Sequence, residues 1–90
     1  MMTTYRVADG VLRAELDGEA VLLNPDTGVY HLLNSTGVTV LDRIERDGDP
    51  TPAVDEISER SGVEADRVAD DVQAFISALI ERKLLARAEP

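Results

Sequence analysis

Gly-Val-Tyr-His-Leu-Leu-Asn, residues 28–34, runs directly into a helix-forming segment, residues 35–46. The first segment predicts a strand over 29–33, and Asn34 or Ser35 can cap the helix that follows. The strands predicted before it can pair with only one of its sides, which leaves a candidate open edge. Because an open edge can take on a strand from another chain, the sequence favours a peptide-binding module.

An antiparallel meander is predicted up to residue 33. Residues 11–16 alternate apolar and polar side chains, with Leu12, Ala14 and Leu16 on one face, which is typical of a half-buried strand. A two-residue hairpin signal, Asp-Gly, leads into the next strand, residues 19–24. A turn cluster, Pro-Asp-Thr-Gly, then precedes the strand 29–33. Residues 5–8 can add a short lead-in strand.

Three helices are predicted after the meander, at about residues 35–46, 52–61 and 64–83. The third carries two apolar lines at spacings of three and four, one of Val68, Val72, Phe75 and Leu79 and one of Ala69, Ile76 and Ile80. The tail from Ala86 is expected to fray. The expected fold class is α+β and winged helix-turn-helix-like, a three-stranded antiparallel sheet followed by three helices, within a single domain over residues 1–90.

Composition narrows the classes of function. Ninety residues allow one modest core, and the absence of cysteine excludes disulfides and cysteine-ligated metal sites. Neither a signal peptide nor an apolar stretch of about 18 residues is present, so we expect a cytoplasmic protein with no membrane partner. No phosphate-cradling glycine loop or metal-ligand spacing appears, and we expect neither a metal nor a cofactor.

Net charge argues against nucleic acid as a partner. The formal net charge is −9. In a winged-helix protein the third helix would enter the major groove, yet the first half of this helix carries Glu64, Asp66, Asp70 and Asp71 against Arg67 alone. Carboxylates there would be repelled by phosphates. A DNA-binding winged helix is therefore kept only as an alternative.

Catalysis finds little support in this chain. His31 is the only histidine, and a nucleophilic triad would need it beside Ser35 or Ser58 with a carboxylate behind it. Ser35 is better explained as part of the helix cap. We therefore expect a protein that is not an enzyme.

Three spaced motifs carry a resemblance to a known family. They are Gly28-x-Tyr30-x-x-Leu33-Asn34-x-Thr36-Gly37-x-x-x-Leu41, Gly48-x-x-Thr51, and Val68-x-x-Asp71-Val72-x-x-Phe75-x-x-x-Leu79. Over residues 11–85 the chain resembles the PqqD-like recognition elements of pathways that make ribosomally synthesised and modified peptides (RiPPs). It is most similar to the stand-alone B1 proteins of lasso-peptide biosynthesis.

That resemblance implies a function and partners. The domain would bind the leader segment of a precursor peptide as an added β-strand, along the third strand and beside the third helix. It would then present the precursor to a leader peptidase, a B2-type transglutaminase-like protease, with the cyclase as a further candidate partner. A PqqD-type chaperone for a radical enzyme in another RiPP pathway is one alternative. An adaptor that dimerises through the same edge is another, and we expect a monomer or weak dimer.

The expected peptide-binding residues lie on the third strand and along the third helix. They are Gly28, Val29, Tyr30, His31, Leu32, Leu33, Arg67, Val68, Asp71, Val72, Phe75 and Leu79. Leu33 is expected in the core, while the sequence leaves open whether Tyr30 or His31 faces the groove. Asp66, Asp70 and Asp71 are expected to flank the groove and to steer a lysine-rich leader toward it.

Overall fold

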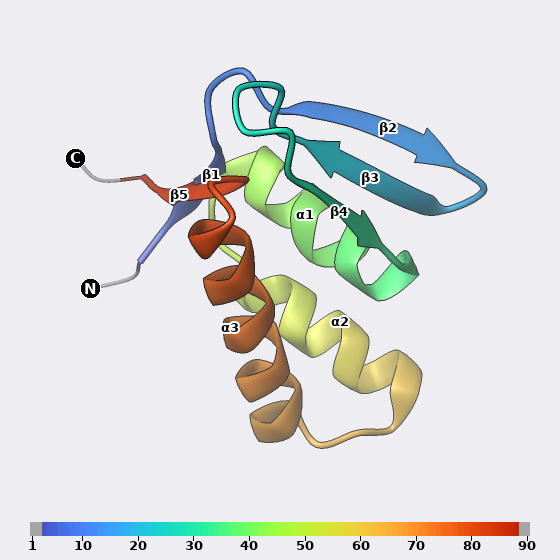
Figure 1. The fold of residues 1–90 in the computed structure, drawn as a ribbon. Helices are drawn as coiled ribbons and strands as arrows, with labels where there is room; N and C mark the ends of the chain where they lie inside the picture. Colours follow the sequence, from blue (N-terminus) through green and yellow to red (C-terminus); the bar gives the residue numbers. More distant parts are fainter. Residues whose placement is uncertain (1–2, 89–90) are drawn as a thin grey trace.

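Five strands and three helices follow one another along residues 3–88, the part of the chain that the computed structural model describes (Figure 1). The first four strands precede the helices, and the fifth follows them. In order, the elements are β1 (Tyr5–Val7), β2 (Leu12–Leu16), β3 (Glu19–Leu23), β4 (Tyr30–Leu33), α1 (Ser35–Asp47), α2 (Thr51–Ser61), α3 (Ala65–Glu81) and β5 (Leu85–Arg87). The predicted α+β class is confirmed, whereas the winged-helix comparison stays a prediction.

Strands β2, β3 and β4 form the predicted meander, in that spatial order. The hairpin between β2 and β3 turns through Asp17 and Gly18, which both have positive φ, as the Asp-Gly signal requires. Strand β4 pairs with β3 from Leu23↔Tyr30 to Ala20↔Leu33. Its other side pairs with no strand in residues 3–88, so the predicted open edge is present.

The face of β2 that lies toward the helices is the opposite of the one predicted from the alternation. Leu12 and Leu16 are 57% and 75% exposed, whereas the side chain of Arg13 points toward α1 and is only 20% exposed. There Asp42 and Glu45 of α1 accept its hydrogen bonds, Asp42 at 2.8 Å. These ion pairs take the place of apolar packing, so the expected burial of the leucine face was wrong.

The first and last strands of the described residues form a second sheet that the sequence analysis missed. Strands β1 and β5 pair antiparallel, with Val7 opposite Leu85 (Figure 1). The expected lead-in strand therefore exists but pairs outside the meander. The expected fraying from Ala86 was wrong for the described residues, because Leu84 and Leu85 are buried in the core and hold the segment in place.

Local signals set the helix ends. The side chain of Asn34 caps α1 by accepting a hydrogen bond from the backbone N–H of Gly37, at 2.9 Å. Gly48 and Gly62, in the left-handed conformation, end α1 and α2. Helix α3 ends two residues before the predicted limit, and Lys83 follows it with φ of 61°. The core lies between the helices and the inner face of the meander.

Candidate peptide-binding groove

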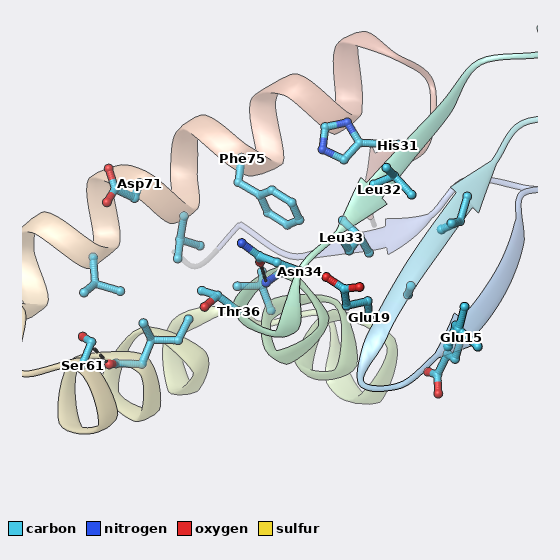
Figure 2. Close-up of a pocket in the computed structure, with 18 of the residues that line it drawn as sticks. Glu15, Glu19, His31, Leu32, Leu33, Asn34, Thr36, Ser61, Asp71 and Phe75 are labelled. Carbon is cyan, nitrogen blue, oxygen red and sulfur yellow. Dashed lines mark hydrogen bonds between the residues drawn. The ribbon is translucent and has the colours of Figure 1, made fainter.

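A cavity of about 970 Å³ opens between β4 and α3 (Figure 2). Residues of β2 and β3, the first turn of α1 and the end of α2 complete its walls. Seven of the predicted binding residues line it: His31, Leu32, Leu33, Val68, Asp71, Val72 and Phe75. The structure thus brings together the third strand and the third helix as the sequence analysis expected.

The backbone of β4 points hydrogen-bonding groups along this cavity that pair with no other strand of residues 3–88. In an antiparallel ladder, successive residues point their N–H and C=O groups alternately toward and away from the partner strand. The Asn24 N–H donates to the Val29 carbonyl at 2.9 Å, which fixes the alternation. His31 and Leu33 therefore pair with β3, whereas the main-chain groups of Tyr30 and Leu32 point to the open edge.

His31, and not Tyr30, faces the groove. Its ring meets that of Phe75 edge to face, with centroids 6.2 Å apart and planes inclined at 70° (Figure 2). Tyr30 is 60% exposed on the outer face of the sheet. Burial, and secondly the positive charge of Arg82, lower the pKa of His31 below its ordinary value of 6.5.

Gly37 allows β4, α1 and α3 to approach one another closely. A Cβ atom at this position would lie 3.3 Å from Cζ of Phe75 and 3.4 Å from Cβ of Leu33. The contact with Phe75 is tighter than ordinary van der Waals packing, so a larger residue would displace that ring. The Asn34 cap holds this first turn of α1 directly after β4.

Five predicted residues do not line the cavity. Leu79 is fully buried in the core, Arg67 is exposed near the start of α3, and Gly28 and Val29 lie in the approach to β4. Tyr30 contributes main-chain groups to the edge while its side chain points outward. Of the three aspartates expected to flank the groove, only Asp71 lines it.

Several lining residues were missed at the sequence level. They come from β2, β3, the first turn of α1 and the end of α2, and include Glu15, Leu16, Glu19, Asn34, Thr36, Gly37, Ile57, Ser61 and Val63. The motif after β4 offered a signal, because its asparagine and glycine are the residues that bring α1 against the strand. The α2 residues carried none, since their place depends on how α2 packs against α3.

Carboxylates dominate the charges of the lining, which contains Glu15, Glu19 and Asp71 and, among residues 3–88, neither lysine nor arginine. No group of three histidine, aspartate or glutamate side chains in that range is arranged to hold a metal ion. None of the helices in the described range is long and apolar enough to cross a membrane. What the cavity offers is therefore apolar surface, main-chain pairing and negative charge.

An antiparallel sheet with one vacant edge beside an apolar groove is the architecture of domains that bind a peptide by strand addition. Sequence comparison agrees with that class: the chain belongs to the PqqD family, whose model, described as coenzyme PQQ synthesis protein D, matches residues 19–85. Comparison with curated protein sequences gave no match.

Two solved structures share the fold. One, described as TbiB1 in complex with the TbiA(beta) leader peptide, is 32% identical with a TM-score of 0.80 and covers 89% of this chain and 93% of its own. The other, a lasso peptide synthetase B1 complexed with the leader peptide, is 23% identical with a TM-score of 0.83 and covers 92% and 98%. Both neighbours span nearly the same length as this chain.

Proposed function

We propose that this protein binds the leader segment of a precursor peptide as a fourth strand beside β4 and delivers it to a leader peptidase in lasso-peptide biosynthesis. The observation that carries the proposal is the vacant β4 edge above the apolar groove. The neighbour TbiB1, which is 32% identical over 89% of this chain, was solved with a leader peptide bound. The resemblance of this chain's motifs to the B1 proteins of lasso-peptide biosynthesis favours the lasso pathway over a PqqD-type role beside a radical enzyme.

The edge and the groove would make different contributions to peptide recognition. Main-chain groups of Tyr30 and Leu32 would pair with any extended segment, so they supply affinity that does not depend on sequence. Selectivity would come from the side chains that enter the groove between Phe75, Val72 and His31. A leucine or tyrosine buried there contributes about 1.5 to 3 kcal/mol before ordering costs.

The outer face of the meander would receive the peptidase. Leu12, Leu16 and Leu32 are 57%, 75% and 70% exposed there, and a cluster of exposed apolar side chains marks a protein–protein contact. A strand added at β4 continues this face, because every second side chain of the added strand points outward. A peptidase docked there would contact the domain and the bound precursor together.

Nuclear magnetic resonance tests the binding half of this proposal. Isotope-labelled protein would be titrated with the TbiA(beta) leader peptide and with leaders of precursor peptides encoded beside the gene. We expect slowed amide exchange at Tyr30 and Leu32 and shifted signals from Phe75 and Val72. If no leader changes the signals of residues 30–33, the proposal is wrong.

Peptidase delivery has its own test. Cleavage of the precursor by the leader peptidase should depend on this protein, and Leu12→Lys, on the outer face and outside the groove lining, should weaken that dependence while leaving the leader affinity unchanged. Ser77→Lys, at an exposed position of α3 outside the groove lining, makes the same change in charge and serves as the matched surface control. Equal cleavage with wild type and Leu12→Lys would refute docking at this face.

A further inference from the structure

We propose that the groove selects its bound strand by the order of charges along it. Cationic residues are preferred in the first half of that strand, and a carboxylate that pairs with Arg82 is preferred in the last part. This inference rests on the proposed function and deepens it. It concerns which peptides bind and in which direction, and it follows from the way charges are distributed along α3 and β4.

One face of α3 carries a negative charge in its first half and a positive charge at its C-terminal end. Asp71, Phe75 and Arg82 are separated by four and then seven residues, which places them on one side of an α-helix. In Figure 2, Phe75 lies between Asp71 and His31, and the charge of Arg82 acts on His31. Eleven helical residues extend over about 16 Å, so the two charges lie near opposite ends of the groove.

Arg82 sits on the vacant edge itself. Its Nη1 donates to the carbonyl oxygen of Tyr30 at 3.5 Å, and that carbonyl points away from β3. The turn that leads into β4 is tied to this end of α3, because Nδ2 of Asn24 donates to the Lys83 carbonyl at 3.0 Å and the Asn24 N–H donates to the Val29 carbonyl. A strand that reaches Tyr30 therefore meets a guanidinium.

The guanidinium of Arg82 is available to a new partner. Its side chain is exposed, and within residues 3–88 no carboxylate forms an ion pair with it. A contact at 3.5 Å to a carbonyl is weak, whereas a guanidinium and a carboxylate can form paired, charge-assisted hydrogen bonds. A glutamate or aspartate on the bound strand would draw Arg82 off the Tyr30 carbonyl.

The opposite end of the groove is acidic. Asp71 and Glu19 line it and have no ion-pair partner within the described part of the chain, while Glu15 is held by Arg13. A lysine or arginine on the bound strand would find an uncompensated carboxylate there, Asp71 on the α3 wall or Glu19 on the β3 wall (Figure 2). Groups at the two ends would thus attract side chains of opposite sign.

The sheet topology sets the direction in which a bound strand runs. Strands β2, β3 and β4 are all antiparallel to their neighbours, and antiparallel pairing is the more stable kind. Strand β4 runs from the Arg82 end toward Asn34, so an antiparallel guest begins at Asp71 and Glu19 and ends at Arg82. A strand rises about 3.3 Å per residue, and the separation of about 16 Å places the two charges about five residues apart.

Matched peptides test this charge order. Two fluorescent peptides of identical composition would carry the central segment of the TbiA(beta) leader between a lysine pair and a glutamate pair, in opposite orders. The unmodified leader is the reference. We expect the lysine-first peptide to bind wild-type protein about tenfold more tightly than the glutamate-first peptide at low salt, with the difference shrinking at high salt.

Charge-reversed variants complete the test. Arg82→Glu should remove most of the preference, and Arg82→Glu combined with Asp71→Lys should reverse it. Arg87→Glu on β5 makes the same change in net charge as Arg82→Glu outside the groove lining and should keep the preference.

The outcomes separate the two proposals. Equal affinities for the two orders in wild type, or a preference for the glutamate-first peptide, would overturn the charge order while leader binding stands. If neither peptide nor the unmodified leader binds, the charge order and the proposed function both fall.

Discussion

A proline at position 32 offers a sharp test of strand addition, because it changes the free side of β4 alone. The Leu32 N–H points to the vacant edge, so its loss removes no hydrogen bond to β3. The Leu32 side chain is 70% exposed, so little apolar burial is lost. We therefore expect Leu32→Pro to fold with nearly the wild-type thermal midpoint.

Leu32→Pro should weaken peptide binding far more than it lowers the stability of the fold. A guest carbonyl that loses its donor in a desolvated strand pair costs about 1 to 3 kcal/mol, which corresponds to about a 5-fold to 150-fold rise in Kd. The proline ring also occupies the space that the guest carbonyl oxygen needs, so the upper part of that range is expected. Leu32→Ala, which keeps the N–H, should bind within a few-fold of wild type.

Fluorescence anisotropy with a labelled leader would measure the affinity, and circular dichroism would measure the fold. His31→Pro is the contrasting variant, because the His31 N–H belongs to the ladder with β3 and its loss should destabilise the domain. A folded Leu32→Pro protein that binds the leader as tightly as wild type would show that the edge of β4 is not the binding element.

Three further predictions concern pH, a turn and the outer face. Because the folded-state pKa of His31 lies below its ordinary value of 6.5, its contribution to stability is complete above that pH and is lost as the pH falls below it. Thermal midpoints measured between neutral pH and the range where carboxylates titrate should show a decline that His31→Gln flattens. Gly48→Ala should destabilise the fold by about 1 to 3 kcal/mol in urea titrations. The reason is that φ is 82° there and the new Cβ would lie 3.1 Å from the Tyr5 carbonyl oxygen. A wild-type urea midpoint would contradict this. Leu12→Lys on the outer face should lower peptidase-dependent cleavage without changing the thermal midpoint, and unaltered cleavage would argue against docking there.

Features that depend on local chemistry could be predicted from the sequence. The Asn34 cap and the Asp17-Gly18 hairpin act within a few residues of themselves, and each appears as expected. The open edge of β4 also followed, because the order of strands in a meander leaves its last strand with one neighbour.

Features that depend on packing between distant segments could not be predicted from the sequence. Alternation in β2 shows which side chains share a face, but which face is covered depended on Asp42 and Glu45 of α1. The choice between Tyr30 and His31 depended on the register with β3. The sequence did not indicate Arg82 as a binding residue. Its place at the edge depends on how the end of α3 packs beside β4, where Asn24 and Lys83 are hydrogen-bonded.

Pairing of β1 with β5 has a practical consequence for building with this domain. The chain enters and leaves the fold through neighbouring antiparallel segments, on the side of the molecule away from β4 (Figure 1). Cargo fused ahead of Tyr5 or behind Arg87 would hang from that single attachment point. The domain could thus be appended to an enzyme, or inserted into one of its loops, with the docking strand still reachable.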